Sequence, residues 1–346
     1  DELKREKEID FNDMIIKSRN FLQNNIKKTF FSHFIIDEFQ DISSARYKLI
    51  NALRELNPEI KFFCVGDDWQ SIYRFADSEL SIMLKYKDYF DGYTEKKELS
   101  NTFRFSQPLA DLSTKFICQN PNQIKKNIKA QKNNNKPSVT ICFDDSDQEG
   151  LEKVLKEIKK ITDNKGDKKI LILGRYNHNI NEKFMDEHEF KKLNKRYPKF
   201  SINFKTIHKS KGLEEDYIIV LDVNTGRLGF PSEMVDDPLL ELVMGEEDKF
   251  EHAEERRLFY VALTRARKHV YLVTDPSKQS SFVRELTKKE NNYLINKLDA
   301  DEISELECKN CKTGWLIKRI PKNIKNPPFY SCSNYPLCDG KAQICN

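Results

Sequence analysis

Two short apolar runs that end in acidic and amide side chains constrain the fold of this chain more than any other feature. Residues 34–41 read FIIDEFQD, and residues 62–73 read FFCVGDDWQSIY. A short apolar run between polar residues is typical of a buried parallel strand. Ligands of open α/β sheets bind at the carboxyl ends of such strands. Asp37, Glu38 and Gln70 would therefore lie where a magnesium-bound nucleotide can be held.

Apolar runs alternate with helical patterns through most of the chain, which predicts an α/β protein with parallel sheets. Residues 94–99 are expected to form a short strand or an extended connector, and the Asn- and Lys-rich residues 120–137 a solvated loop. The other expected strands are 31–37, 60–66, 139–143, 169–174, 202–206, 217–221 and 269–274, and the expected helices are 1–29, 42–57, 78–90, 106–119, 147–163, 177–194 and 251–267.

Length and composition indicate a soluble, ordered protein. At 346 residues the chain can form two globular domains with cores of their own. It is 33% charged and 38% hydrophobic, and it has no run of the ~18–20 apolar residues that a membrane span needs. Its first residues form a charged helical pattern rather than a signal peptide. We therefore expect a cytoplasmic protein with no membrane partner.

The pattern divides the chain into four parts. We expect a first domain at 1–104, a second domain at 105–275, a charged helical linker at 276–306 and a small separate domain at 307–346. The charge is uneven along the chain, because residues 308–346 hold seven Lys or Arg residues and one Asp, whereas the whole chain has a formal net charge of +4. The last part is thus a compact basic unit.

Four of the eight cysteines have the spacing of a zinc site. Cys308 and Cys311 form a C-x-x-C pair, and Cys332 and Cys338 follow after a basic segment that contains Trp315. Four thiolates are the ligand set of a closed tetrahedral Zn²⁺ site, and cysteine clusters of a reducing cytoplasm are more often metal sites than disulfides. Such a small zinc domain can bind nucleic acid or another protein.

The residues after the first two strands suggest distinct chemical roles. Asp37 can hold Mg²⁺, usually through water, and Glu38 can activate the water that attacks a γ-phosphate. Gln70 can sense a phosphate oxygen, while Tyr73 and Phe75 offer rings on which bases can stack. Taken alone, Tyr73 and Phe75 are more typical of core residues, and a bare Asp-Glu pair is more typical of a solvated loop.

Five segments in order resemble the motifs of superfamily I DNA helicases of the UvrD/Rep type. Residues 34–41 resemble their Walker B segment, and residues 65–75, 99–105, 206–214 and 255–267 resemble the third, fourth, fifth and sixth motifs. The resemblance implies two RecA-like parallel-sheet domains, the first incomplete, that use ATP and Mg²⁺. It also implies DNA translocation in the 3′-to-5′ direction and unwinding at junctions of single-stranded and double-stranded DNA, in repair or recombination.

The resemblance also implies roles for individual residues. Arg104 corresponds to an arginine finger, and Arg265 to the arginine that reaches the γ-phosphate. Glu214 corresponds to a residue that contacts the nucleotide ribose. Thr206 and His208 correspond to residues that bind the DNA backbone, and Gln70 to the residue that couples the γ-phosphate to bound DNA. Two arginines facing one phosphate are what charge stabilisation of phosphoryl transfer requires.

Further details resemble a subgroup of the family. The D-W-Q sequence at 68–70 and the T-F-R-F sequence at 102–105 resemble bacterial helicase IV. Only about 100 residues separate Arg104 from Thr206, which leaves room for no more than a reduced 2B insertion. The basic segment at 307–346 resembles the zinc ribbons of bacterial type I topoisomerases, which bind single-stranded DNA.

The sequence contains no phosphate-binding loop of the form G-x4-G-K-[ST], since Gly340-Lys341 is followed by Ala342. Without such a loop the phosphates lose their backbone N–H cradle and its lysine. We expect this chain alone to hydrolyse ATP poorly and to need an N-terminal helicase portion, on the same gene product or on a partner chain. Two alternatives remain open, a non-catalytic DNA-binding or regulatory module and a translocase that acts on RNA.

Overall fold

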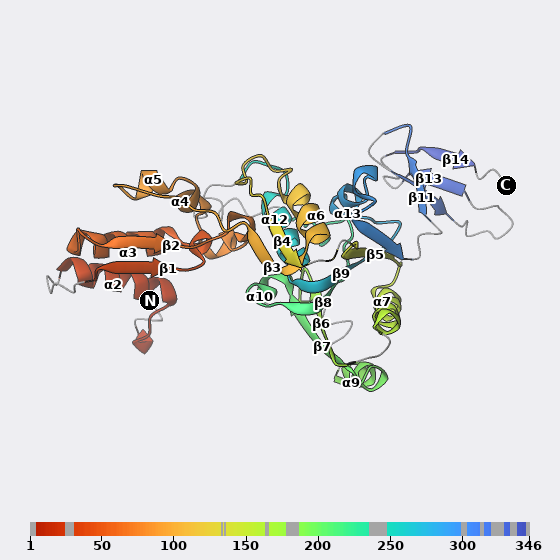
Figure 1. Cartoon of the computed structure of the whole chain (residues 1–346), viewed down its shortest axis with the longest axis horizontal. Helices are drawn as coiled ribbons and strands as arrows, with labels where there is room; N and C mark the ends of the chain where they lie inside the picture. The colour runs from red at the N-terminus through yellow and green to blue at the C-terminus, as the bar shows by residue number, and fades with distance from the viewer. Residues whose placement is uncertain are drawn as a thin grey trace. The chain divides into compact units, whose positions relative to one another are not determined.

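The computed structural model forms two compact units (Figure 1), each described here by itself. Unit 1 comprises residues 1–98, 121–124 and 235–257, and unit 2 comprises residues 99–120, 125–234 and 258–346. The structure describes residues 5–24, 31–132, 134, 136–162, 166–177, 187–234, 248–298, 303–311, 315–319, 329–332 and 338–343.

Unit 1 is built on two parallel strands. Strand β1 (His33–Ile36) pairs with β2 (Lys61–Cys64) in the register Ile36↔Cys64, as expected for the two apolar runs. Alternate side chains of both strands pack on one aromatic-rich core that includes Phe39 and Phe90. The helices of this unit are α2 (Phe11–Asn24), η1 (Phe39–Asp41), α3 (Ser44–Leu56), η2 (Asp68–Gln70), η3 (Arg74–Ala76), α4 (Leu80–Leu84) and α5 (Tyr86–Tyr89).

Helix α3 begins at a capping residue, and the helix expected at 78–90 is divided in two. The Ser43 hydroxyl accepts a hydrogen bond from the Arg46 N–H, which caps α3. The single helix expected at 78–90 is two short helices that meet at Lys85. Residues 94–99 contain no strand, so the extended connector is the form that the structure adopts.

Unit 2 centres on a six-stranded sheet in the order β10-β5-β9-β8-β6-β7 (Figure 1), whose neighbouring strands are all parallel. This confirms the predicted α/β class with parallel sheets. Strand β3 (Asn101–Ser106), which carries Arg104, pairs in parallel with β4 (Lys129–Lys132). The other strands are β5 (Val139–Phe143), β6 (Lys168–Gly174), β7 (Phe200–Thr206), β8 (Glu215–Val220), β9 (Ala266–Thr274) and β10 (Ile295–Leu298), and the helices are α6 (Gln107–Ile117), α7 (Asp147–Ile161), α9 (Glu187–Arg196), α10 (Ile207–Ser210), α13 (Ser281–Leu286) and η4 (Lys289–Asn291).

Unit 2 contains two apolar clusters, one of which packs on the sheet. Helix α7 buries Leu151, Val154 and Ile158 in a cluster with residues of β5, β6 and β9. The aromatic rings of α6, α12 (Ala253–Leu263) and α13 pack with centroids 5.0–5.3 Å apart; they belong to Phe116, Phe259 and Phe282. Such aromatic contacts add about 0.5–1.5 kcal/mol each beyond the area they bury.

Three expectations for unit 2 are corrected. The segment 276–306 is not helical throughout, because α13 is followed by β10, whose Ile295 is buried beside Val139 at the sheet edge. The solvated loop at 120–137 contains strand β4. The helix expected at 251–267 is limited to α12, because residues from Ala266 onward already belong to β9. Strand β4 was hidden because its sequence KAQK is largely exposed and has no apolar alternation, and β10 was hidden because it lies in a charged region.

The chain ends in a four-stranded antiparallel sheet in the order β11-β12-β13-β14. Its strands are β11 (Ile303–Glu307), β12 (Trp315–Arg319), β13 (Phe329–Cys332) and β14 (Lys341–Gln343). The boundaries proposed for the four domains remain predictions. Among the residues that the structure describes, no helix combines the length and the apolar character that a membrane crossing requires.

Candidate functional site

The carboxyl ends of β1 and β2 lie side by side. The Val65 N–H donates to the Ile36 carbonyl and the Phe39 N–H donates to the Val65 carbonyl, both at 2.8 Å. Asp37 and Glu38 therefore leave β1 at the edge where the third-motif segment leaves β2, as the pairing of parallel strands predicts. Both carboxylates are exposed.

Glu38 occupies an unusual backbone conformation. Its φ of 50° and ψ of 43° place it in the left-handed region, and its N–H donates to Asp37 Oδ1 at 2.8 Å. A side chain other than glycine is rare there, and such a conformation costs about 1–3 kcal/mol. Strained backbone conformations cluster at functional sites, so this geometry supports a functional role for Glu38.

Gln40 is a fully buried amide that joins the two strand ends. Its Nε2 donates to Glu38 Oε2, and its Oε1 accepts the Asp67 N–H at 2.9 Å. The Gln40 carbonyl accepts a hydrogen bond from the Ser71 hydroxyl at 3.3 Å. The backbone of Gly66 lies so close that a β-carbon there would come within 2.8 Å of Gln40 Oε1.

The third-motif segment is shaped by Asp67. One oxygen of its carboxylate accepts the Trp69 N–H at 3.1 Å and caps η2, while the other accepts Gln70 Nε2 at 2.6 Å. The predicted residue Gln70 is thus at the same strand edge as Asp37 and Glu38, where Asp67 connects it to Gln40.

Asp68 and Trp69 are both fully buried and bind the segment 121–124 of unit 1. Trp69 Nε1 donates to the Ile124 carbonyl and the Ile124 N–H donates to Asp68 Oδ2, both at 2.9 Å. Arg257, in the first turns of α12, donates its Nε–H to the Ser71 carbonyl at 2.7 Å. Burial lowers the pKa of Arg257, and the nearby carboxylates, Glu254 first, oppose that effect.

The two predicted base-stacking residues lie next in the same segment. The rings of Tyr73 and Phe75 meet edge to face at 5.9 Å, and Phe75 is 63% exposed. The pKa of the Tyr73 hydroxyl is raised, first by burial and then by the charges of Asp41 and Glu38. The exposed ring of Phe75 next to Tyr73 is compatible with base stacking.

Within unit 2 the predicted phosphate and ribose residues gather in one cluster. Arg104 Nε pairs with Glu214 Oε2 at 2.6 Å, and its Nη1 donates to the Thr264 carbonyl at 3.2 Å. Arg267 also pairs with Glu214, at 2.6 Å. Hydrogen bonds from Arg267 and then Arg104 hold the pKa of Glu214 below its usual value. Lys132, from the unexpected strand β4, donates to the carbonyls of Arg104 and Arg267.

Arg265 lies beside this cluster but is only 1% exposed. Its guanidinium donates to the Val261 carbonyl at 3.0 Å and to the Leu213 carbonyl at 3.3 Å. It sits in the turn between α12 and β9 rather than on the last turn of a helix. The structure thus brings Arg104, Glu214 and Arg265 together, with the Arg265 side chain turned into unit 2.

Thr206 and His208 lie at the junction of β7 and α10. The buried Thr206 hydroxyl accepts the Lys209 N–H at 3.4 Å and caps the short helix. His208 is half-buried. Thr206 therefore has a structural role, and the contact of both residues with DNA stays a prediction.

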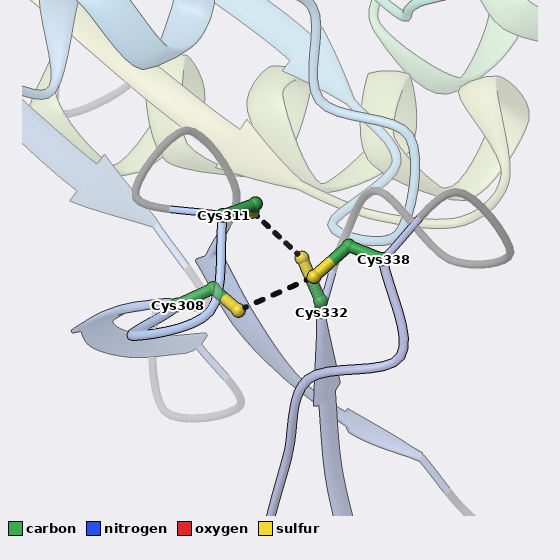
Figure 2. A group of neighbouring side chains, drawn as sticks. All are labelled: Cys308, Cys311, Cys332 and Cys338. Atoms are coloured by element: carbon green, nitrogen blue, oxygen red, sulfur yellow. Dashed lines mark hydrogen bonds between the residues drawn. The ribbon is translucent and has the colours of Figure 1, made fainter.

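Figure 2 shows the four predicted zinc ligands, Cys308, Cys311, Cys332 and Cys338, pointing toward a common centre. Their sulfurs all lie within 4.8 Å of one another, with Cys308 and Cys338 3.7 Å apart and Cys311 and Cys332 3.5 Å apart. Four sulfurs around Zn²⁺ at about 2.3 Å would be about 3.8 Å apart in a tetrahedron. The residues therefore fit a structural zinc ion. Trp315 begins β12, but its side chain lies outside the described part of the chain.

Sequence reasoning missed several residues of these sites. Gln40, Asp67 and Arg257 were assigned no role, and Lys132 was placed in a solvated loop. The only local sign of Gln40 was an amide inside the acidic segment DEFQD, and its burial between two hydrogen-bond partners became evident only in the structure. Nothing in the sequence around Lys132 indicated its contacts with two backbone carbonyls.

Comparison with known proteins agrees with this geometry. Residues 1–91 match the family described as "UvrD/REP helicase N-terminal domain", and residues 185–276 match "UvrD-like helicase C-terminal domain". The chain is 37% identical over 281 residues to DNA helicase IV of Escherichia coli, covering 81% of this chain and 39% of that protein. It is 30% identical over 158 residues to the ATP-dependent DNA helicase srs2 of Schizosaccharomyces pombe, covering 44% of this chain and 17% of that protein.

A solved structure of the C-terminal domain of a possible DNA helicase from Lactobacillus plantarum covers 57% of this chain and is itself covered to 98%. Its TM-score of 0.32 and 15% identity are too low to carry an argument about the fold. The chain spans well under half the length of the two curated relatives named above.

The parallel α/β sheets agree with the two matched helicase domains. The chain belongs to the UvrD/Rep helicase family. The expected similarity to bacterial helicase IV is confirmed.

Proposed function

We propose that this chain is the C-terminal portion of an ATP-dependent DNA helicase that couples ATP hydrolysis to movement along single-stranded DNA. The observation that carries the proposal is the shared edge of β1 and β2, where Asp37, Glu38 and Gln70 leave adjacent strands and are linked through Gln40 and Asp67. Membership of the UvrD/Rep family supports it.

In this proposal the exposed carboxylates hold the metal and the water. Bound Mg²⁺ would neutralise phosphate charge, with Asp37 as its ligand. Glu38 takes a proton from the attacking water, and Gln40 fixes the direction of the Glu38 carboxylate. Gln70 donates a hydrogen bond from its Nε2 to a γ-phosphate oxygen and moves with the segment that carries Tyr73 and Phe75.

The arginines of unit 2 would supply positive charge in the transition state. Arg104 is paired with Glu214 at 2.6 Å, so it must leave this partner, or share it, to act on a phosphate. Arg265 must turn out of its backbone-carbonyl contacts. Glu214, once released, can accept hydrogen bonds from ribose hydroxyls. Nucleotide binding would therefore rearrange this cluster.

The proposal includes a dependence on a further segment. Because the sequence contains no G-x4-G-K-[ST] loop, the phosphate cradle must come from elsewhere on the same gene product or from a partner chain. Movement from 3′ to 5′, a role in DNA repair or recombination and action at junctions of single-stranded and double-stranded DNA follow from the family resemblance. The zinc ribbon, with its seven basic residues, would hold single-stranded DNA.

A second candidate is a non-catalytic DNA-binding module that retained the fold. The strained backbone of Glu38 disfavours it, since binding alone gives no reason to hold a carboxylate at a cost of about 1–3 kcal/mol.

The test compares ATP hydrolysis, with and without a single-stranded oligonucleotide, by this chain alone and by a protein that also contains the loop-bearing segment. We expect negligible turnover by the chain alone and DNA-stimulated turnover by the longer protein that Glu38→Gln abolishes. Equal oligonucleotide binding with no turnover in either form would favour the second candidate. Binding of RNA in preference to DNA in the same titration would contradict the choice of substrate.

A further inference from the structure

Gln40 occupies a position that requires both a hydrogen-bond donor and an acceptor. It is fully buried, it donates through Nε2 to the Glu38 carboxylate, and it accepts through Oε1 the Asp67 N–H. A carboxylate at this position could not donate, and an aliphatic side chain could do neither. The donor and acceptor on its two sides therefore fix the orientation of the amide.

The contacts continue on both sides of Gln40. Asp67 accepts a hydrogen bond from Gln70 through its Oδ2, while its own N–H is held by Gln40. The connected groups are thus Glu38, Gln40, Asp67 and Gln70, which span the ends of both strands. The fully buried amide lies in the middle of this path, and the more accessible side chains of Glu38 and Gln70 lie at its two ends.

The backbone around Gln40 leaves it little freedom. A β-carbon at Gly66 would approach Gln40 Oε1 to 2.8 Å and the Gln40 N to 3.0 Å, so the β2 side of the site is pressed against the amide. The Gln40 carbonyl is held by the Ser71 hydroxyl. Burial and close packing together keep one rotamer, which is what a positioning residue requires.

We propose that Gln40 is the positioning residue that fixes the water-activating carboxylate of Glu38 and connects it to Gln70 of the third motif. A shift of the third-motif segment would move the Asp67 N–H, hence the Gln40 amide, hence the Glu38 carboxylate. Hydrolysis would then respond to the conformation of the segment that carries the exposed Phe75 ring. This inference deepens the proposed function and rests on it for its catalytic part.

The charges that face the site determine how it can be tested. Besides Glu38 and Asp67, the carboxylates of Asp37 and Asp41 are near, and Arg46 donates to the Asp41 carbonyl at 3.1 Å. Tyr73 adds a hydroxyl whose pKa is raised by burial and by the charges of Asp41 and Glu38. A new carboxylate at position 40 would thus meet mainly negative charge and would bind a proton more readily than an ordinary glutamate.

The variant Gln40→Glu converts this into a pH-dependent measurement. In its protonated form the substituted side chain has one O–H donor and one carbonyl acceptor, so at low pH it replaces glutamine in both hydrogen bonds. As pH rises through its raised pKa it loses the donor and repels Glu38. The variant should therefore match the parent protein near pH 4, below the pKa of about 4.3 of an unfolded glutamate, and lose thermal stability relative to it as pH rises, by a Tm shift of about 4 °C or more near pH 8.

Two further variants make the result specific. Gln107→Glu changes another bridging amide, in unit 2, which donates to Asp111 and the Ile128 carbonyl and accepts the Ala130 N–H. It should not alter ATP hydrolysis beyond two-fold at any pH. Gly66→Ala should displace the Gln40 amide without adding a charge. The loss of thermal stability that it causes should therefore be the same at low and high pH.

The catalytic readout uses the protein that contains the loop-bearing segment. Gln40→Glu should lower kcat at least ten-fold at pH 8 with the KM for ATP within two-fold, and kcat should recover toward pH 6. A kcat profile parallel to that of the parent protein would overturn the positioning role, as would an equal effect of Gln107→Glu. If no form hydrolyses ATP, the proposed function fails, whereas the pH-dependent Tm shift still tests the hydrogen-bonded path by itself.

Discussion

The contact of Trp69 with Ile124 gives a prediction that tests how unit 1 is held together. Trp69→Phe keeps a buried ring but removes the Nε1 donor that the Ile124 carbonyl accepts at 2.9 Å. Loss of the hydrogen bond costs about 1 kcal/mol. Two fewer buried ring carbons cost about 1.6 kcal/mol, at about 0.8 kcal/mol for each buried carbon group. We expect unit 1 to be destabilised by about 2–3 kcal/mol.

The measurement is hydrogen exchange of the peptide segment at 61–73 across a urea series, with far-UV circular dichroism for the whole chain. Tyr93→Phe is the matched control, since Tyr93 is an aromatic side chain of unit 1 that is 96% exposed; it should change stability by less than about 0.5 kcal/mol. Asp68→Asn combined with Trp69→Phe should be non-additive, because both side chains bind the backbone of Ile124. A Trp69→Phe variant within about 0.5 kcal/mol of the parent protein would refute the reasoning.

Three other predictions follow from single sites. Glu38→Asn and Glu38→Ala should both abolish DNA-stimulated ATP hydrolysis, and both lose the hydrogen bond from Gln40. The Asn variant should be the more stable of the two by about 0.5–1 kcal/mol in urea unfolding, because asparagine tolerates the left-handed backbone better; equal stability of the two variants would argue against strain at this position. Gly340→Ala should reduce the zinc content of the purified protein well below one ion per chain, because a β-carbon there would collide with Cys308 Sγ. The control variant Lys341→Ala, at an exposed neighbouring residue, should retain the ion. Full retention of zinc by both variants would contradict the proposed centre. Burial lowers the pKa of His269 to about 4, so the unfolded chain binds a proton at this residue before the folded chain does. Stability should therefore fall as pH drops below about 6.5, with a loss of about 2 kcal/mol at pH 5. The variant His269→Gln should flatten this pH dependence, whereas His33→Gln, at an exposed site, should leave it unchanged.

The part of the fold that could be predicted has a strong local signal. Apolar runs such as 34–36 and 170–173 are short, uninterrupted and followed by polar or turn residues, so their strands were expected close to their observed bounds. Strand β4 has the sequence KAQK, which carries no apolar alternation, and it exists because β3 lies beside it. Strand β10 was hidden in a charged region, although Ile295 is buried at the sheet edge.

The candidate sites divide in the same way. Asp37, Glu38 and Gln70 could be placed together because the carboxyl ends of neighbouring parallel strands must meet at one edge. Cys308, Cys311, Cys332 and Cys338 could be grouped because their spacing suits one tetrahedral ion. The burial of Arg265, the pairing of Arg104 with Glu214 and the contacts of Arg257 depend on residues that lie far apart in sequence, and no local pattern encodes them.

By itself, the sequence determined the chemical inventory and its order: which carboxylates end a strand, which cysteines can share an ion, and which motifs follow one another. Periodicity and spacing are properties of neighbouring residues, so they can be read without a fold. The tertiary structure alone decided what each side chain meets, from the amide of Gln40 between Glu38 and Asp67 to the backbone carbonyls around Arg265. Those contacts join distant segments in a packed interior, where position rather than sequence separation sets the interaction.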